Sequence, residues 1–591
     1  MKPNKFLTTF LIWRIRHVST RNFLIVISGV VGLIGGTAAV TLKSTVHYIQ
    51  YLLRNFRSDF SDYLYLIYPA IGILITALVA DRILKEKLGH GITNILYAIS
   101  KKSSILGRTK MYSRMITSAI TVGFGGSVGL EAPIVVTGSA IGSNIGRWMH
   151  LSYRQRTLMI GCGAAAAISG IFNSPVAGVI FSIEVILTDV TVAAFIPLLI
   201  ASVIGALVSM LTLGSDVLFS FNLQDPFEAS DFPFYLLLGA FCGLASVYFT
   251  RVTLYTEALA MKVKSKTWRA LLGGLGLGVI IFIFHPIYGE GYDSITTILN
   301  GNPEQLLEDS FLLKDLDSTL YLILFALGVL LIKPVATGLT IGAGGNGGIF
   351  APSLFIGAIT GYIYSQSVNT LGFGKELSIS NFTLVGMCGV MSGVMHAPLT
   401  AIFLIAEITS GYTLFLPLML VSAVALSTSR YFEQYSFYTG KLIKAGDLIQ
   451  HDKDRQVLSL IKIEKLIETD LLTIEPDKKL EDLVALVRMS KRNIFPVVNT
   501  ENELQGIITL DDIRDIMFDP NSQKSVIVET LMHKPPATVS PEDGMAEVMN
   551  KFERTGAWNL PVISEQGYLG IVSKSRIFNA YRTKLKRQNK E

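Results

Sequence analysis

The sequence has few cysteines and few charged residues for its length. Only three of its 591 residues are cysteines, and their spacing fits neither a disulfide framework nor a metal site. Charged residues make up 16% of the chain and the net charge of +6 is scattered, which gives no argument for a nucleic-acid partner. None of the eight histidines is followed by Glu, so the His-Glu-x-x-His motif of metalloproteases is absent. We therefore expect no enzyme activity, no metal site and no nucleic-acid partner.

Long apolar runs occupy the chain up to about residue 445. Examples are residues 23–42, 65–80, 193–213 and 320–332. Most of them are long enough, or nearly so, to cross a hydrocarbon layer of ~30 Å as helices. Short β-rich runs and charged helical stretches follow, with no further spanning run. The sequence therefore predicts a polytopic membrane protein in the lipid bilayer, with a water-soluble domain at its carboxyl-terminal end.

The amino-terminal segment, residues 1–22, is basic and partly amphipathic. It lacks a small-residue cleavage site, so it does not resemble a removable signal peptide. Basic residues near this end, within residues 101–114 and near the carboxyl terminus favour the cytoplasmic side. We expect an integral protein of the cell (inner) membrane with both termini and the soluble domain in the cytoplasm.

The membrane region contains an internal repeat. The stretch GSVGLEAP at residues 126–133 matches GNGGIFAP at residues 345–352, at an offset of 219 residues (133 against 352). A second pair, residues 169–184 and 392–407, aligns at an offset of 223 residues (175 against 398) and places Glu184 opposite Glu407. Ordered matches at a nearly constant offset predict two homologous halves.

Each GxxGxxAP stretch places a glycine-rich loop directly before a proline that suits the first turn of a helix. Such a helix end presents free backbone N–H groups and the positive end of the helix dipole, which attract an anion when buried. Paired, glycine-interrupted segments in two halves point to a transport site near the bilayer midplane. For the glycines within residues 138–146, close helix packing is the favoured role.

Glu131 is the only carboxylate in the first of these stretches. An isolated charge inside a membrane protein costs at least ~2.5 kcal/mol unless it is paired, solvated or protonated. Glu131 can instead occupy the anion site at the helix ends and leave it on protonation or displacement. The sequence predicts that this carboxylate is a tethered competitor of a diffusible anion.

These residues resemble the CLC family of chloride channels and chloride/proton antiporters. Gly129-Leu130-Glu131-Ala132-Pro133 stands where the family has Gly-Arg-Glu-Gly-Pro, whose Glu is the gate. Gly348-Ile349-Phe350-Ala351-Pro352 matches the family's Gly-x-Phe-x-Pro motif. The resemblance extends from about residue 20 to the carboxyl terminus. It implies an all-α membrane domain of two inverted-topology repeats, chloride or another small anion as the transported ion, no required cofactor, and a homodimer with one pathway per subunit.

The resemblance also implies which residues bind the anion. They belong to three motifs and a late tyrosine: His90, Gly91, Ile92, Gly129, Leu130, Ile349, Phe350, Ala351 and Tyr438. In the first motif, usually Gly-Ser-Gly-Ile-Pro, His90 replaces the serine and Thr93 the proline. The imidazole can donate an N–H to the anion and make permeation pH-dependent. Alternatively, the ring points away and the backbone amides alone bind the ion.

Val185 occupies the position at which antiporters of this family usually carry an inner, proton-transferring Glu. Because valine cannot titrate, the resemblance favours a channel that conducts anions passively. A chloride/proton antiporter is the alternative, since some exchangers lack that acid. For Glu184 we expect a structural cap or pair, and for Lys333 either a positive charge along the anion path or snorkelling to the interface.

The soluble tail contains a second duplication. RNIFPVVNTENELQGIITLDDIRDI, from residue 492, matches GAWNLPVISEQGYLGIVSKSRIFNA, from residue 556, in the order strand, turn, strand, helix. This resembles a tandem pair of α/β CBS domains, in which Thr509 and Asp512 would hold the ribose of an adenine nucleotide (ATP, ADP or AMP). A purely structural, dimer-stabilising pair is the alternative. The sequence thus predicts an amphipathic segment 1–22, a membrane domain 23–446, a linker 447–462, a first CBS domain 463–520, and a second CBS domain with a basic tail 521–591.

Overall fold

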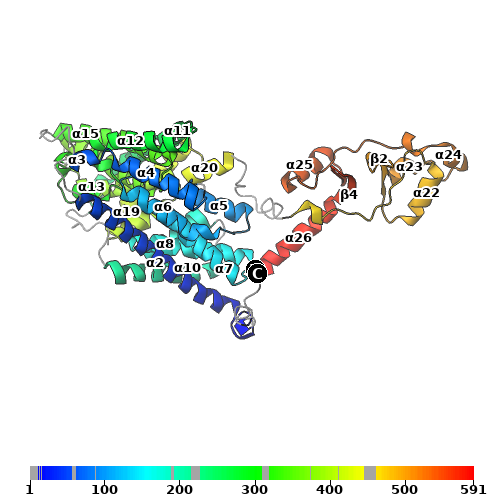
Figure 1. Cartoon of the computed structure of the whole chain (residues 1–591), viewed down its shortest axis with the longest axis horizontal. Coiled ribbons are helices and arrows are strands. Elements are labelled where there is room, and N and C mark those ends of the chain that lie inside the picture. The colour runs from blue at the N-terminus through cyan, green and yellow to red at the C-terminus, as the bar shows by residue number, and fades with distance from the viewer. Residues whose placement is uncertain are drawn as a thin grey trace. The chain divides into compact units, whose positions relative to one another are not determined.

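The computed structural model shows a mostly helical unit followed by a smaller α/β unit, the expected fold class (Figure 1). The two compact units comprise residues 1–448 and 449–591. The structure describes residues 9, 11, 13–14, 16–55, 61–86, 88–187, 192–214, 227–308, 319–372, 375–409, 411–444 and 461–590. Half of the expected amphipathic segment and most of the expected linker therefore lie outside the described residues.

The first half of the membrane unit is a series of helices of unequal length. They are α2 (Thr20–Asn55), α3 (Ser61–Leu64), α4 (Tyr68–Leu78), the π-helix η1 (Val79–Ile83), α5 (Gly91–Lys101), η2 (Arg108–Met111), α6 (Ser113–Gly123), α7 (Glu131–Trp148), α8 (Tyr153–Phe172), α9 (Pro175–Phe181), the π-helix η3 (Ser182–Ile186) and α10 (Val192–Leu213). The run at residues 65–80 is thus a short helix with a π-helical end.

The second half is also a series of helices of unequal length. They are η4 (Ala229–Asp231), α11 (Phe232–Met261), α12 (Lys266–Ile283), η5 (His285–Ile287), α13 (Tyr292–Leu299), α14 (Gln305–Glu308), α15 (Thr319–Ala343), α16 (Phe350–Leu371), α17 (Ile379–Met395), α18 (Pro398–Ile408), α19 (Phe415–Phe432) and α20 (Phe437–Lys444). Prolines in the first turn begin α9 and α18 at equivalent places of the two halves.

Within the described residues, six helical stretches are long and apolar enough to cross a membrane. They are Thr20–Asn55, Ala193–Leu213, Ala229–Met261, Lys266–Ile283, Thr319–Ala343 and Phe415–Ile443. Their outward-facing side chains include exposed Leu, Phe and Ile residues, as expected where lipid rather than water surrounds the helix. The expectation of an integral membrane protein is confirmed.

Glycines allow the two central helix pairs to cross closely. A Cβ atom on Gly138 of α7 would stand 2.1 Å from the carbonyl oxygen of Gly163 in α8. At the equivalent crossing, a Cβ atom on Gly357 of α16 would stand 2.5 Å from the carbonyl oxygen of Gly386 in α17. Because any larger residue would force the helices apart, these glycines serve packing, and they do so at the same place in each half.

Two carboxylates interlock the halves. Glu184, at the end of the first half's repeat, accepts hydrogen bonds from the backbone N–H groups of Leu399 (3.2 Å) and Thr400 (2.8 Å) at the start of α18. Glu407 reciprocates by accepting from the N–H groups of Val176 (3.0 Å) and Ala177 (2.8 Å) at the start of α9. A carboxylate at a helix amino terminus is stabilised by free N–H groups and the dipole. The repeat is therefore built into the structure as a reciprocal pair of caps.

The soluble unit contains two hairpins, as the duplication predicts. Its elements are η6 (Ile463–Lys465), α22 (Leu480–Met489), β1 (Ile494–Val498), β2 (Leu504–Thr509), α23 (Leu510–Ile513), α24 (Pro520–Ser525), η7 (Val528–Thr530), α25 (Met545–Thr555), β3 (Asn559–Ser564), β4 (Gly567–Ser573) and α26 (Lys574–Lys590). β1 pairs with β2 and β3 with β4, both antiparallel. Each first strand also takes a parallel bridge from an upstream residue, Ile474 to Val497 and Val539 to Val562.

Candidate functional site

The two GxxGxxAP stretches meet in space. Gly129 and Gly348 form an antiparallel bridge, with N···O distances of 2.9 Å and 2.7 Å. The next helices, α7 and α16, begin at Glu131 and Phe350. A Cβ atom on Gly348 would stand 2.8 Å from the Cβ atom of Ala132, so only glycine permits this approach. Two helix amino termini, one from each half, therefore share one buried centre with their free N–H groups.

Glu131 lies inside this centre and is only 1% exposed. Its Oε1 atom accepts a hydrogen bond of 2.6 Å from the hydroxyl of Tyr292. The backbone N–H groups of Glu131 itself and of Ala351 also lie close to the carboxylate. A Cβ atom on Gly129 would stand 2.0 Å from the Oε2 atom. The carboxylate thus occupies the space between the two helix ends, and glycine at position 129 leaves room for it.

Tyr438 and Phe350 lie in the same buried region. Tyr438 is 2% exposed, and its hydroxyl has no hydrogen-bond partner among the described residues. It lies near enough to Glu131 for the charge of the carboxylate to act on it. Phe350 stacks on Phe172, with ring centroids 5.4 Å apart. A buried hydroxyl that donates to no protein group is able to donate to an anion.

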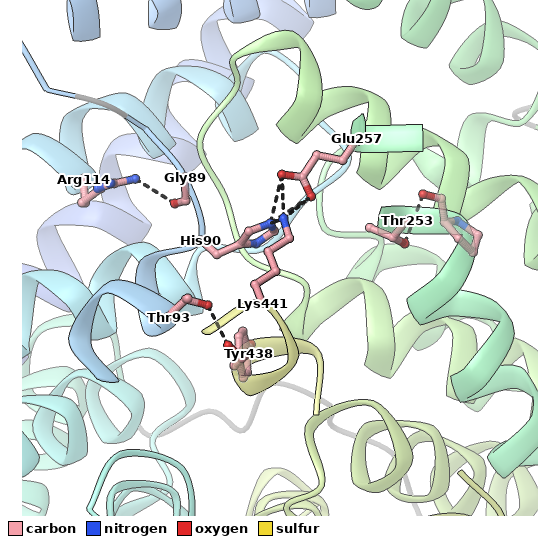
Figure 2. Close-up of polar contacts among 9 residues, drawn as sticks. Gly89, His90, Thr93, Arg114, Thr253, Glu257, Tyr438 and Lys441 are labelled. Carbon is pink, nitrogen blue, oxygen red and sulfur yellow. Dashed lines mark hydrogen bonds and ion pairs between the residues drawn. The ribbon is translucent and has the colours of Figure 1, made fainter. Parts of the chain in front are cut away.

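The amino-terminal end of α5 completes the group of expected residues. The hydroxyl of Thr93 donates to the backbone carbonyl of Tyr438 at 3.0 Å and so ties α5 to α20 (Figure 2). Ile92 is 1% exposed. A Cβ atom on Gly91 would stand 2.5 Å from the side chain of Val136 in α7. The chain segments with the expected anion-binding residues are therefore brought together from α5, α7, α16 and α20.

The imidazole of His90 contacts charged side chains on two other helices. Figure 2 shows its ring directed at Glu257 of α11 and Lys441 of α20. Its Nε2 atom lies 2.9 Å from Oε2 of Glu257 and 2.7 Å from Nζ of Lys441. Lys441 Nζ also lies 2.9 Å from Oε2 of Glu257. Of the two sequence interpretations, this geometry favours the one in which backbone amides alone face the anion.

Two residues of the site were missed by the sequence reasoning. Glu290 accepts a hydrogen bond of 3.1 Å from the backbone N–H of Leu130, the residue before Glu131, and Tyr292 binds Glu131 directly. Both belong to the short stretch GEGYD at residues 289–293. An acid between two glycines, followed by a tyrosine, is a weak signal in a membrane region. The stretch was overlooked because it has no counterpart in the repeat.

Lys333 binds the backbone at the start of that stretch and just before it. It is fully buried, and its Nζ atom donates to the carbonyl oxygens of Ile287 and Gly289, both at 3.2 Å. The ammonium also lies 4.7 Å from the ring centroid of Phe355, a cation–π distance. Snorkelling to the interface is therefore wrong for Lys333, and its amino group stays between Gly289 and Phe355 of α16.

At the expected inner proton position, Val185 packs against the apolar core of the membrane unit. Its neighbour Glu184 is held by α18, where the hydroxyl of Thr400 adds a third hydrogen bond of 2.7 Å. The expectation of a structural cap for Glu184 is confirmed.

In the soluble unit, Thr509 and Asp512 bind each other. Asp512 Oδ2 accepts from the backbone N–H and the hydroxyl of Thr509, both at 2.7 Å. Its Oδ1 atom lies 3.3 Å from Nε2 of His533. Burial acts to raise the pKa of Asp512, but the hydrogen bonds from Thr509 and the nearby His533 outweigh it and hold the pKa below its ordinary value. The pair forms the cap of α23, and the carboxylate remains ionised at neutral pH.

Comparisons with known proteins identify the family. The voltage gated chloride channel family matches residues 72–430, and the CBS domain matches residues 463–519 and 528–583. The chain is 26% identical over 606 residues to chloride channel protein CLC-e of Arabidopsis thaliana, covering 88% of this chain and 82% of that protein. A slow cyanobacterial Cl⁻/H⁺ antiporter has the same fold, with a TM-score of 0.63 at 21% identity over 74% of this chain and all of that one. A eukaryotic CLC transporter matches with a TM-score of 0.61 at 18% identity over 94% of this chain and 99% of that one. The chain belongs to the voltage gated chloride channel (CLC) family and carries two CBS domains.

Proposed function

We propose that this chain is an anion channel in which Glu131 competes with chloride for the site between α7 and α16. The observation behind the proposal is the docked carboxylate, held by the hydroxyl of Tyr292 at 2.6 Å between two helix amino termini. The same free N–H groups suit a halide when the side chain leaves. Protonation of Glu131, or displacement by anion, opens the pathway.

Passive conduction is the proposed mode because the inner position holds Val185, which cannot carry a proton. The neighbouring acid, Glu184, is committed to three hydrogen bonds at the start of α18. A proton arriving at Glu131 from one side therefore has no carboxylate at the usual inner position to receive it.

The test is a reversal-potential measurement on purified protein in liposomes with opposed chloride and proton gradients. For conduction, the reversal potential follows the chloride gradient alone and does not move when only the proton gradient changes. A shift with the proton gradient overturns conduction in favour of exchange. Glu131→Gln is the companion variant, with faster flux at neutral pH and little dependence on pH.

Chloride/proton exchange is the second candidate, and one observation favours it. Glu257, His90 and Lys441 form a cluster at 2.7 to 3.1 Å beside the amino-terminal end of α5. The Nε2 atom of His90 cannot both donate to Glu257 and accept from Lys441, so the tautomer of the ring decides which of the two hydrogen bonds forms. Such a cluster would replace the acid missing at residue 185. If the reversal potential does follow protons, Glu257→Gln should abolish that coupling.

For the CBS domains we propose an adenine-nucleotide site at Thr509 and Asp512. The ionised Asp512 carboxylate, one side of which faces His533, suits the hydroxyl pair of a ribose. Isothermal titration of the full-length protein with ATP, ADP and AMP tests it, with Asp512→Asn as the variant that keeps an acceptor for the Thr509 cap. Equal heats for both proteins would exclude this residue from the site and leave the structural alternative.

We also propose a homodimer with one pathway per subunit, a place in the cell (inner) membrane, and cytoplasmic termini and CBS domains. Mass determination in detergent and protease protection of the soluble unit in oriented vesicles test them.

A further inference from the structure

A cavity of about 250 Å³ lies beside the amino-terminal end of α7. Leu130, Glu290 and Tyr292 line one part of it, and Lys43 and Arg54 of α2 line another. Both basic residues lie in the half of α2 farther from the amino terminus. Figure 1 shows α13, which begins at Tyr292, at the end of the membrane unit opposite α20. With both termini in the cytoplasm, the cavity belongs to the outer side of the gate.

Glu290 binds the backbone N–H group of Leu130, the residue directly before Glu131. Its Oε1 atom accepts from the N–H of Leu130 at 3.1 Å, and Leu130 directly precedes Glu131. A carboxylate at such a donor forms a charge-assisted hydrogen bond, about twice as strong as a neutral one. An anion that approaches α7 from the cavity meets this occupied donor first.

The position of Glu290 is fixed by its backbone. The flanking glycines, Gly289 and Gly291, have φ values of +60° and +87°, which few other residues adopt. A Cβ atom on Gly291 would stand 2.5 Å from the ring of Phe355. Lys333 holds the carbonyl of Gly289 at 3.2 Å. The backbone of Glu290 is therefore held in one conformation, unlike that of a surface acid that samples many conformations.

Titratable groups of both signs lie around Glu290. Lys43 and Lys333 act on it as positive charges, and Glu131 acts on it as a negative one. Tyr292, from the same stretch, binds Glu131. The other charged and titratable residues that line the cavity are His47, Arg54, His285, Tyr288 and Asp293. Two carboxylates and two amines thus surround the start of α7, and a change of charge on one carboxylate alters the energy of the other.

We propose that Glu290 is a second tethered competitor of the anion, placed on the outer side of Glu131 at the Leu130 N–H. Chloride or another small anion from the cavity replaces the Glu290 carboxylate at this donor before Glu131 moves. Lys43 and Lys333 then balance the arriving anion when Glu290 is protonated or displaced. This inference rests on the proposed gating by Glu131, and it adds an outer step whose pH dependence is linked to that of Glu131.

The test measures chloride flux in liposomes while the chloride concentration and pH of the outer side alone are varied. Glu290→Gln keeps an acceptor for Leu130 but removes the charge. We expect the outer chloride concentration at half-maximal flux to fall about tenfold, which corresponds to about 1.4 kcal/mol. We also expect the wild-type profile against outer pH to spread over two steps, and either Glu290→Gln or Glu131→Gln to leave one.

Asp293→Asn is the matched control. Asp293 lines the same cavity, its side chain is 92% exposed, and it pairs with Arg54 at 3.3 Å rather than with a backbone donor. The Asp293→Asn substitution removes the same charge as Glu290→Gln and should leave the outer chloride concentration at half-maximal flux within twofold of wild type. Glu290→Gln removes one negative charge beside Lys43 and Lys333. If this variant folds poorly, Glu290→Gln/Lys43→Met removes one positive charge as well and restores the balance.

The outcomes separate the two proposals. A wild-type chloride dependence and a two-step pH profile in Glu290→Gln, with a changed profile in Glu131→Gln, overturn the role of Glu290 and leave the gate intact. An equal shift in Asp293→Asn also overturns it, because the effect would then be one of general surface charge. If Glu131→Gln is itself unchanged, the gating proposal fails first.

Discussion

Tyr292→Phe is the substitution that tests the docked gate most selectively. It removes one hydroxyl, whose oxygen lies 2.6 Å from Oε1 of Glu131, and leaves the ring and the carboxylate in place. A hydrogen bond to a charged group contributes about 1.5–3 kcal/mol. Taking about 2 kcal/mol, the balance between docked and undocked Glu131 shifts about 30-fold toward the undocked state, since 1.4 kcal/mol is tenfold.

The assay is chloride efflux from liposomes at neutral and acidic outer pH. Tyr292→Phe should raise the efflux rate at neutral pH, by up to about 30-fold where undocking limits the rate, and should change it little in acid, where Glu131 is already neutral. Tyr288→Phe is a control from the same region, because the Tyr288 hydroxyl contacts the carbonyl of Gly123 at 3.4 Å and not the gate. If Glu131→Gln raises neutral-pH efflux but Tyr292→Phe does not, the hydroxyl does not hold the carboxylate. If neither changes efflux, Glu131 is not the gate.

Three further predictions follow from other contacts. Gly129→Ala places a Cβ atom 2.0 Å from Oε2 of Glu131, so it should expel the carboxylate and weaken the pH dependence of efflux, whereas an unaltered pH profile would show that the docked position is not used. Glu184→Gln should lower the thermal unfolding temperature in detergent, because an amide cannot accept all three hydrogen bonds at the start of α18 and each bond to a charged group contributes about 1.5–3 kcal/mol. The same variant should leave the pH dependence of efflux unchanged. A changed pH profile would contradict a purely structural cap. The folded-state pKa of Asp512 lies below its ordinary value. The stability that this carboxylate contributes is therefore present above about pH 4, the unfolded Asp value, and is lost as the pH falls through the folded value. The difference in unfolding temperature between wild type and Asp512→Asn should shrink in acid, and a constant difference would refute this.

The repeat explains why much of the fold could be predicted from the sequence. The two GxxGxxAP stretches are local patterns, and their offset of 219 residues (133 against 352) implies a symmetric relation that the Gly129–Gly348 bridge realises. Helix ends begun by glycine and proline follow from backbone chemistry within a few residues. The same holds for the two hairpins of the soluble unit.

The rest of the site depends on tertiary placement. Glu290 is 160 residues from Leu130, and Glu257 is 167 residues from His90. Neither acid lies in a repeated or helix-end pattern, so nothing local indicates its partner. The role of His90 was left open for the same reason: the replacement of serine by histidine is visible in the sequence, but the Glu257 and Lys441 side chains that attract the ring are not.

The contacts of glycines where two helices cross could be predicted only in part. The sequence favoured packing for the glycines of residues 138–146, which the contact between Gly138 and Gly163 confirms. The identity of the facing residue could not be predicted, because it depends on the crossing point of α7 and α8. That point is set by the packed helices as a whole.

Competition between Glu131 and the anion for one site can be seen in crystals of wild type and Glu131→Gln grown with bromide in place of chloride, because the anomalous scattering of bromide locates the ion. We expect a bromide peak beside the backbone N–H of Ala351 and the Cα atom of Gly129 in Glu131→Gln, at the position that the carboxylate occupies in the wild type. A Glu131→Gln crystal with no bromide between the starts of α7 and α16, or a wild-type crystal with bromide there beside a docked Glu131 carboxylate, would contradict it.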